Sequence, residues 1–480
     1  MEGGVAERIW RMGVAELAGA VRAGDLSCRD AVSAHLDRIA SINPRLNAAT
    51  RCLEREALRA ADEADAATRK DDRGGALRGV PITLKDNIDL VGSPTTQGSP
   101  LLRAAMPARD APLVERLKRA GAIPIARTNL PDFGLRWHTD SALYGPTLNP
   151  WDPSRTPGGS SGGDAVAVAT GMAPAGIGND YGGSLRYPAQ CCGVMALRPT
   201  PGRIPQASTT APVERPIGVQ LIAVQGPIAR RVSDLRLLFE VMRGADPRDP
   251  WSIPEPRAQA TAVPRRVAML VDPGGIGIDR EIAAAVRRAG EALAVAGYDV
   301  EVREPPHLDE AFDLFTLLTF AEIRALILPQ VRPLASAEAI RYLELTLAGR
   351  APDDPAAYMQ GLADRTRIAR AWAQFALDFP LLLGPVSTAP PFEVGFDLKG
   401  AEEAGALFRS MRLVVSVSLL GLPAVALPIA MGGGRPQGVQ LIGPRYGEAL
   451  CLDAAEAIER SCGAPLPIDP RGRREGDDGG

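Results

Sequence analysis

The spacing of apolar residues indicates helices in the first part of the chain. Between residues 13 and 66, apolar side chains such as Leu17 and Val21 recur every three to four positions, which is the spacing of one helix face. Ser27 precedes a run that continues to Ala40, and serine suits the N-cap position of such a helix. The pattern therefore predicts two or three helices before the first strand.

Further along, short apolar runs bounded by turn residues predict β-strands. These runs are residues 77–84, 122–126, 266–271, 299–302, 379–385, 423–428 and 438–443. Helical patterns lie between them at residues 113–120 and 279–296 and after the last of them at 448–459, and a further helix is expected to open within 226–235. Strands that alternate with helices are typical of an α/β layer architecture.

The same pattern predicts how the chain is divided. We expect one domain over residues 1–480, with a helical lead at about 1–70, an α/β core at about 71–460 and a flexible tail at about 465–480. The strand–helix–strand pattern from 266 to 302 is typical of a separate unit, but the later apolar runs favour one continuous sheet. Polar, proline-rich residues 244–264 are expected to form a surface excursion.

Composition and charge exclude several classes of protein. The 480 residues are 45% hydrophobic and 23% charged, which is ordinary for a globular protein. The net charge of -3 gives no basis for binding nucleic acid or an anionic membrane by bulk electrostatics. The six cysteines form no C-x-x-C pair, so the sequence predicts neither a zinc site nor a disulfide framework. Without a signal-peptide pattern or a membrane-length apolar run, we expect a cytoplasmic protein.

Two glycine- and serine-rich corners stand out against this background. The first is Pro157-Gly-Gly-Ser160-Ser161-Gly-Gly, and the second is Asn-Asp-Tyr-Gly-Gly-Ser184-Leu-Arg. The Ala/Val-rich run between them, residues 165–169, predicts a buried helix that packs one corner against the other. Glycine allows positive φ and close backbone approach, so the two corners are suited to placing two serines side by side.

A serine nucleophile needs a base, and histidine is the usual one. The three histidines (His35, His138 and His307) do not lie in a Gly-x-Ser-x-Gly context. Lys85 ends an apolar, strand-like run, and burial there would favour its neutral amine near pH 7. Lys85 is therefore the candidate base.

Each candidate also has a structural explanation. Taken alone, Lys85 is more typical of a solvated strand end, Ser184 of a helix N-cap, and residues 158–163 of a glycine turn without chemistry. A phosphate-binding loop is disfavoured, because the Lys-Ser/Thr pair of a P-loop is missing. The presence of all three candidates in one chain favours a catalytic role over a purely structural one.

The motifs around Lys85, Ser160 and Ser184 resemble those of the amidase signature family, over about residues 14–459. The resemblance implies a three-layer α/β/α fold with a large mixed central sheet, and no metal or cofactor. It also implies that Ser184 is the nucleophile, Ser160 the serine with a cis peptide bond, and Lys85 the base. Further roles implied are oxyanion donors at the backbone amides of Tyr181, Gly182 and Gly183, with Ser184 as a fourth candidate, and supporting groups at Ser161, Asp180 and Arg186.

Several positions depart from the family pattern. Tyr181 replaces a small or β-branched residue, so its ring is expected to narrow the pocket. Asn179 replaces serine or threonine. Arg127 and Asp132 are changed members of a Lys-Thr-Asn-x-x-Glu-Phe motif, and Ser418 stands where asparagine is frequent.

The resemblance predicts an amide hydrolase in which Ser184 attacks the carbonyl and Ser160 relays the proton to Lys85. Segments 133–138 and 314–320 are mostly apolar, which favours a small, neutral, apolar or aromatic carboxamide. Trp137 and His138 are the candidate substrate-binding residues, whereas an inward-facing Arg136, Glu322 or Arg324 would instead suit a charged substrate. The expected partner is a small-molecule amide, without nucleic acid or membrane, and a homodimer is left open.

Two alternatives stay open at this point. One is a glutamine-hydrolysing amidotransferase subunit that serves a tRNA-bound substrate. The other is a catalytically silent scaffold or binding module, against which the intact Lys85, Ser160 and Ser184 argue.

Overall fold

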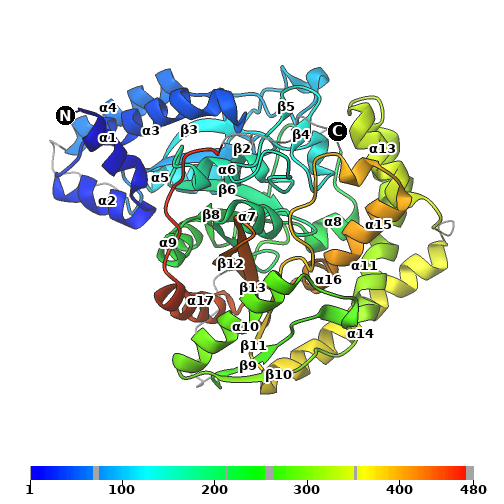
Figure 1. The fold of residues 1–480 in the computed structure, drawn as a ribbon. Helices are drawn as coiled ribbons and strands as arrows, with labels where there is room; N and C mark the ends of the chain where they lie inside the picture. The colour runs from blue at the N-terminus through cyan, green and yellow to red at the C-terminus, as the bar shows by residue number, and fades with distance from the viewer. Residues whose placement is uncertain (1, 69–74, 212, 255–263, 351–353, 472–480) are drawn as a thin grey trace, which may run out of the picture.

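A large mixed sheet with helices on both faces forms the centre of the molecule (Figure 1). The structure is a computed structural model that describes residues 2–68, 75–211, 213–254, 264–350 and 354–471. Within these residues eleven strands join in the order β1-β3-β2-β6-β8-β7-β12-β13-β11-β9-β10. Both parallel and antiparallel pairs occur, as in β2–β6 and β6–β8. The predicted α/β/α fold class is confirmed.

The strands are β1 Ala49–Cys52, β2 Pro81–Lys85, β3 Ile123–Thr128, β4 Asp140–Ser141, β5 Gly145–Pro146, β6 Ala175–Asp180, β7 Met195–Arg198, β8 Val224–Ala229, β9 Arg266–Met269, β10 Asp299–Val302, β11 Leu381–Pro385, β12 Ala424–Gly432 and β13 Arg435–Ile442. The first helices are α1 Glu2–Arg11, α2 Val14–Ala23, α3 Cys28–Ile42, α4 Glu54–Thr68, α5 Pro112–Arg119, α6 Gly162–Ala169, α7 Arg186–Cys192, α8 Ile217–Ile222 and α9 Val232–Met242. The later helices are α10 Arg280–Val295, α11 Leu308–Glu322, α12 Leu328–Val331, α13 Ala337–Leu347, α14 Pro355–Asp378, α15 Ala401–Ser410, α16 Arg412–Leu420 and α17 Glu448–Cys462. Short helical turns lie at Asn43–Arg45, Pro100–Leu102, Asp132–Gly134, Pro273–Gly275, Ile323–Ile327 and Phe396–Leu398.

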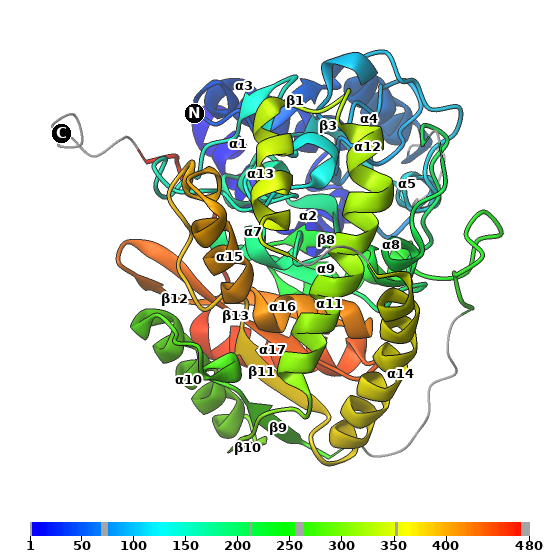
Figure 2. The same cartoon turned by 90° about the vertical axis from the view of Figure 1, so that its right-hand side faces the viewer.

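Alternation along β2 shows how the sheet divides two hydrophobic cores. Side chains of a strand point alternately to its two faces. Ile82 and Leu84 enter the core that contains residues of α5, α9, α10 and α17. Thr83 and Lys85 point to the other face, where both contact the segment at the start of α6. The second core lies on that side and includes α3, α7, α11 and α16. Figure 2 shows α11, α14 and α16 packed together there.

The strands β1, β4, β5, β6 and β8 were not predicted, and β1 and β8 illustrate different physical reasons. β1 lies inside the expected helical lead and pairs antiparallel with β3. Its sequence, Ala-Thr-Arg-Cys, is too short and polar to show a strand pattern. β8 contains Gly226 and Pro227, which have low strand propensity, but it is held between β6 and β7. The helix expected to open within 226–235, near Ser233 or Asp234, begins inside that range, at Val232.

The strand–helix–strand segment β9-α10-β10 continues the main sheet. β9 pairs in parallel with both β10 and β11, so it joins the segment to the rest of the strands. Of the expected surface excursion 244–264, residues 255–263 lie outside the described residues.

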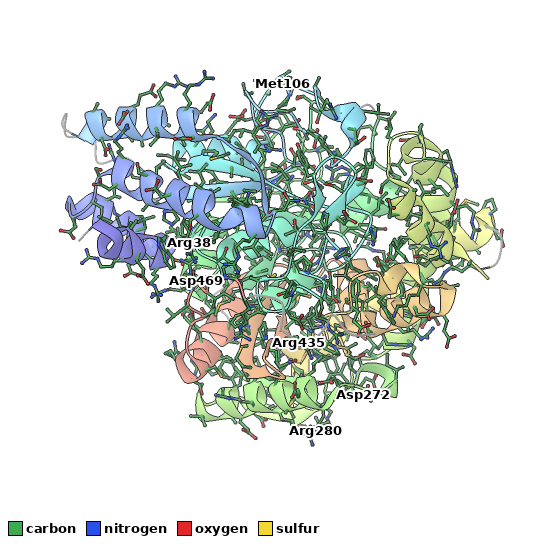
Figure 3. The ribbon with its side chains drawn as sticks, turned by 45° about the horizontal axis from the view of Figure 1, so that its top comes forward. Arg38, Met106, Asp272, Arg280, Arg435 and Asp469 are labelled. Carbon is green, nitrogen blue, oxygen red and sulfur yellow. The ribbon has the colours of Figure 1, made fainter. Side chains whose placement is uncertain are left out.

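The end of the described chain returns to the N-terminal helices. Asp469 forms an ion pair with Arg38 at 2.7 Å, and the two side chains lie together in Figure 3. The backbone N–H of Ile468 donates to the carbonyl of Ala169 at 3.0 Å. The part of the expected flexible tail that the structure describes is thus attached to the body of the protein, whereas residues 472–480 lie outside the described residues. No helix in the described part of the chain is long and apolar enough to cross a membrane.

Candidate active site

The sheet brings the two glycine–serine corners to the end of β2. β2 and β6 are parallel neighbours, with Leu84 beside Ile177, so their carboxyl ends lie at the same edge of the sheet. Lys85 is the last residue of β2, and Ser160 lies just before α6. The Lys85 Nζ to Ser160 Oγ distance is 2.7 Å. Both side chains are buried, with exposed fractions of 0% and 2%.

Three oxygen atoms surround the Lys85 amine. Lys85 Nζ lies 2.7 Å from Ser160 Oγ, 3.0 Å from Ser161 Oγ and 2.7 Å from Asn179 Oδ1. Burial lowers the pKa of Lys85 to about 7, although the carboxylates of Asp164 and Asp180 act in the opposite direction. A neutral amine has two N–H donors and one lone pair, so this environment suits a base. It also excludes the solvated strand end that Lys85 alone would suggest.

The backbone of the first corner requires glycine at close contacts. The Gly159–Ser160 peptide bond is cis, as the resemblance implied. A Cβ on Gly159 would lie 2.6 Å from the carbonyl oxygen of Arg136. A Cβ on Gly178, in β6, would lie 2.5 Å from Ser161 Oγ. These glycines therefore leave room for the serines to approach the sheet.

Ser184 lies at the second corner and is linked to the first through the backbone. Its carbonyl oxygen accepts a hydrogen bond from the Ser161 N–H at 3.2 Å. Helix α7 begins only at Arg186, with Leu185 at its N-cap, so Ser184 is not the helix cap that it alone would suggest. Within the described residues the Ser184 hydroxyl forms no hydrogen bond, including the one to Ser160 that the predicted relay uses. Ser184 is nearly buried, with 7% of the residue exposed.

The turn before Ser184 presents backbone amides, and one of the predicted donors already has an acceptor. The Gly183 N–H donates to Asp180 Oδ1 at 2.8 Å, so it is already engaged. The N–H groups of Tyr181, Gly182 and Ser184 have no acceptor among the described residues. Gly183 has φ 99°, and a Cβ there would lie 2.4 Å from Val414 Cγ1. Gly183 thus determines the backbone conformation of the turn, while the N–H groups without an acceptor in the described part of the chain belong to its neighbours Tyr181, Gly182 and Ser184.

Buried charged side chains hold the turn before Ser184 in place. Arg186 donates to Asp180 from Nε at 3.0 Å and from Nη2 at 3.1 Å, and Arg198 Nη1 adds a contact at 3.1 Å. Burial opposes ionisation of Asp180, but the two guanidinium groups hold the pKa of its carboxyl well below the usual range. Ser418 Oγ accepts from Arg186 Nη2 at 2.8 Å, so serine keeps a polar contact at a position where asparagine is frequent in the family.

The two candidate substrate-binding residues have other partners. His138 is 2% exposed, its Nδ1 lies 3.0 Å from Thr156 Oγ1, and burial lowers its pKa to about 4. This burial and this contact are typical of a packing residue. The Trp137 indole N–H donates to the carbonyl oxygen of Gly182 at 3.0 Å. Trp137 therefore contacts the turn before Ser184 directly, which its sequence context did not indicate.

Aromatic side chains cover the turn on the side of α11. Tyr181 packs against Phe315, with ring centroids 5.6 Å apart, and its hydroxyl lies 2.8 Å from Thr319 Oγ1. Phe408, from α15, packs against Trp137 at 5.4 Å. We call this cluster the aromatic wall; it consists of Trp137, Tyr181, Phe312, Phe315, Phe320 and Phe408. The segment 314–320 was predicted to be apolar, whereas the contribution of Phe408 was missed.

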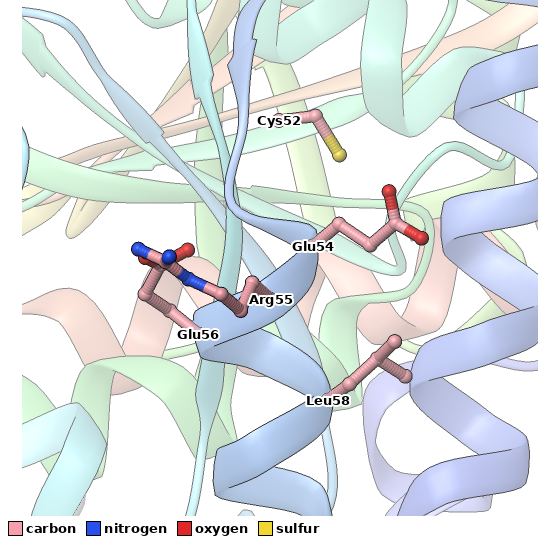
Figure 4. Close-up of a pocket in the computed structure, with 5 residues that line it drawn as sticks. All are labelled: Cys52, Glu54, Arg55, Glu56 and Leu58. Atoms are coloured by element: carbon pink, nitrogen blue, oxygen red, sulfur yellow. The ribbon is translucent and has the colours of Figure 1, made fainter.

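A separate surface hollow of about 450 Å³ lies at the start of α4. It is lined by Cys52, Glu54, Arg55, Glu56 and Leu58 (Figure 4). Burial raises the pKa of the Cys52 thiol, which makes it a poor nucleophile. None of the predicted site residues lines this hollow. In the described part of the chain, no group of three or more His, Cys, Asp or Glu side chains is arranged to hold a metal ion.

Comparisons with known proteins agree with this geometry. The Amidase family model matches residues 30–452. The chain is 41% identical to an indoleacetamide hydrolase of Bradyrhizobium diazoefficiens, over 95% of this chain and 87% of that protein. It is 33% identical to a glutamyl-tRNA(Gln) amidotransferase subunit of Moorella thermoacetica, over 93% and 96%. The solved structure of a 6-aminohexanoate cyclic dimer hydrolase superposes with a TM-score of 0.81 at 27% identity, covering 96% and 99% of the two chains.

Proposed function

This chain belongs to the amidase family and hydrolyses amides, and from that premise we propose which residues carry the reaction and which amide is cleaved. The proposed substrate is a small, neutral, aromatic carboxamide of the arylacetamide type. Ser184 is the proposed nucleophile, Ser160 the proton relay and Lys85 the base. The observation that carries this assignment is the buried Lys85 amine, 2.7 Å from Ser160 Oγ beside a turn with free amides.

In the proposed reaction, Ser184 Oγ bonds to the carboxamide carbon while Ser160 accepts its proton. Ser160 passes its own proton to the lone pair of Lys85. The two N–H groups of the neutral amine remain directed at Ser161 Oγ and Asn179 Oδ1, so these contacts orient the lone pair toward Ser160. The proton then returns to the leaving nitrogen, the C–N bond breaks, and ammonia departs. Water attacks the ester by the same route, which releases the carboxylate and restores Ser184.

We assign the oxyanion donors to the free amides of Tyr181 and Gly182. The Gly183 N–H is excluded from this role because Asp180 accepts it. A donor of this kind typically contributes about 2.7–4 kcal/mol to the stability of the transition state. Asp180, in turn, is proposed to hold the turn in place through Arg186 and Arg198, without touching the substrate.

The aromatic wall and the buried charges support a neutral aromatic substrate. Arg136 forms a two-pronged ion pair with Asp397, at 3.0 and 3.1 Å, so it is not available to a substrate carboxylate. Glu322 Oε1 accepts hydrogen bonds from Gly218 and Tyr358, at 2.6 Å each. Glutamine would need partners for both an ammonium and a carboxylate group. The hydrolase from Bradyrhizobium diazoefficiens is named for an aromatic acetamide.

The broader expectations remain part of the proposal. A net charge of -3 supports a small-molecule partner over nucleic acid, and we propose a cytoplasmic location. We also propose that residues 1–480 form one domain, because eleven strands that lie between Ala49 and Ile442 share one sheet.

The test compares substrates on the purified protein. Indole-3-acetamide, phenylacetamide and glutamine are supplied at matched concentrations, and ammonia release is measured. We expect kcat/KM for the aromatic amides to exceed that for glutamine by at least about 100-fold, which corresponds to about 2.7 kcal/mol. A higher kcat/KM for glutamine, with or without partner subunits, would establish the amidotransferase alternative. Labelling with a fluorophosphonate followed by peptide mapping identifies the nucleophile, and we expect the label on Ser184.

A further inference from the structure

Hydrogen bonds hold most carbonyl groups of the turn from Asp180 to Ser184. The carbonyl of Asp180 accepts from Arg198 Nη1 at 2.8 Å. The carbonyls of Gly183 and Ser184 accept from backbone N–H groups of α7 and of the first corner. The carbonyl of Gly182 differs, because its one hydrogen bond among the described residues comes from an aromatic side chain, the indole of Trp137, at 3.0 Å.

This contact fixes one peptide plane of the turn from both ends. The group between Gly182 and Gly183 is planar, so its C=O and N–H move together. Trp137 holds the C=O, and Asp180 Oδ1 holds the N–H at 2.8 Å. Two consecutive glycines would otherwise rotate over a wide range of φ and ψ. When the peptide group between Gly182 and Gly183 is fixed, rotation about the bonds to the Gly182 Cα is restricted. The direction of the Gly182 N–H, which belongs to the preceding peptide group, is then restricted as well.

The indole is itself immobilised against the turn. Trp137 is 7% exposed, and its ring packs against Phe408 at 5.4 Å. A Cβ on Gly182 would lie 3.8 Å from Trp137 Cζ2 and 3.4 Å from Phe315 Cζ. The donor therefore has little conformational freedom to lose when it binds the carbonyl, which makes it suited to defining a direction.

We propose that Trp137 is a positioning residue for the oxyanion site. Its indole N–H holds the Gly182 carbonyl and so aims the Gly182 N–H at the oxygen on which charge develops. This inference rests on the proposed function, in which that amide stabilises the oxyanion. Trp137 acts through Gly182 and does not itself bind the substrate, so its N–H contributes more in the transition state than in the ground state. The signature of such a group is a lower kcat with a nearly unchanged KM.

The first test removes the donor and keeps an aromatic ring, in Trp137→Phe. Trp372→Phe is a matched control, because the Trp372 indole also donates to a backbone carbonyl, that of Pro306 at 2.7 Å, and is 5% exposed. With indole-3-acetamide we expect kcat of Trp137→Phe to fall by about 10- to 100-fold, somewhat less than for loss of a donor itself. KM should stay within about threefold of wild type. The control should keep its kcat while the Tm of both variants falls.

A second variant separates the N–H from the ring. Site-specific incorporation of 3-benzothienylalanine at position 137 keeps the bicyclic shape and replaces the N–H by sulfur. We expect the same loss of kcat with a smaller change in Tm. An aldehyde inhibitor that forms a tetrahedral adduct with Ser184 should weaken by the same factor as kcat. The product carboxylate, which forms no adduct, should bind unchanged, and the pH dependence set by Lys85 should not move.

Two outcomes would overturn the proposal. A benzothienylalanine protein with kcat within twofold of wild type would show that the N–H does not aim the amide. A rise in KM at constant kcat would make Trp137 a substrate-binding residue. Failure of the proposed function is distinguishable, since wild-type protein would then not cleave aromatic amides. The rate of fluorophosphonate labelling of Ser184 needs no amide substrate. It would still report on the oxyanion site in the wild type, in Trp137→Phe and in the benzothienylalanine protein.

Discussion

The catalytic centre and the aromatic wall meet at the turn from Asp180 to Ser184, but they are held together in different ways. In the centre, buried polar groups make several directed contacts each, as Lys85 does with three oxygen atoms. In the wall, rings meet at tilted angles, and Phe408 alone packs against four of them. Hydrogen bonds weaken steeply when they are misaligned, whereas apolar contacts change gradually with distance.

This difference determines where the protein tolerates substitution. A substitution in the centre leaves a buried donor, acceptor or charge without its partner, so its effect is large. A substitution in the wall removes contact area and lets neighbours relax, so its effect is graded. We therefore expect the chemical step to depend on the centre and on the one hydrogen bond that reaches it from the wall, that of the Trp137 indole. The choice of substrate is expected to depend on the apolar ring contacts of the wall.

The largest expected effect comes from Ser184→Ala. Removing the nucleophilic oxygen should lower kcat by at least about 10⁴-fold, as for nucleophiles in other serine hydrolases. The fold should be kept, because the Ser184 hydroxyl forms no hydrogen bond within the described residues and its contact with the first corner is through the backbone. Ammonia release and circular dichroism together check this. Activity above a tenth of wild type would remove Ser184 as the nucleophile.

Lys85 is expected to have the next largest effect and to set the pH dependence. Because burial lowers its pKa to about 7 and the neutral amine is the base, kcat/KM should rise with pH and level off above about 7. Lys85→Ala should lose this rise and slow acylation by about 10²- to 10⁴-fold. Lys85→Arg should be nearly as slow, since a guanidinium stays protonated. An unchanged pH profile in Lys85→Ala would mean that the base is another group.

Asp180→Asn should reveal the cost of breaking the charge network under the turn. It leaves Arg186 and Arg198 buried with less compensation, so the free energy of unfolding at pH 7 should fall by about 3–5 kcal/mol. The folded-state pKa of Asp180 is held below its unfolded value of about 3.9. Its contribution to stability is therefore present above pH 4 and is lost as the pH falls toward the folded-state pKa.

Urea unfolding measures this effect, and Asp62→Asn is its control. Asp62 also pairs with an arginine, Arg29, but the two side chains are 56% and 51% exposed. Its loss should change the free energy of unfolding by less than about 1 kcal/mol. Equal losses in the two variants would contradict the contrast between a buried and a solvated network.

The sequence predicted the centre better than the wall, for a physical reason. Attack on an amide by a serine needs a base nearby and small residues around both groups, and these occur in short motifs that contain Lys85, Ser160 and Ser184. The structure brings Lys85 and Ser160 together and shows the expected cis bond. Their catalytic roles are the proposal that the variants above test.

Features that depend on tertiary packing could not be predicted, because no local sequence pattern indicates them. The contact of Trp137 with Phe408 joins residues far apart in the chain, and no spacing rule relates them. The engagement of the Gly183 amide by Asp180 depends on the geometry of the turn, so the family resemblance could not distinguish Gly183 from the other candidate donors. Likewise, β8 exists because two neighbouring strands pair with it, against the propensity of its own Gly226 and Pro227.

The smallest expected effect, and the sharpest test of the contrast, comes from Phe315→Leu in the wall. Phe315 packs against both Tyr181 and Phe408, so a leucine keeps an apolar side chain but loses the ring contacts, which are worth about 0.5–1.5 kcal/mol each. For indole-3-acetamide we expect kcat/KM to fall by about 10-fold, mostly through KM. For propionamide, which has no ring to pack, the change should be less than about twofold. Phe239→Leu is the control, because Phe239 is 3% exposed in the core on the other face of the sheet. It should lower Tm without altering KM for either amide. If Phe315→Leu lowered kcat equally for both amides, the ring contacts of the wall would act on the chemical step, and the separation between directed hydrogen bonds and apolar contacts would not hold.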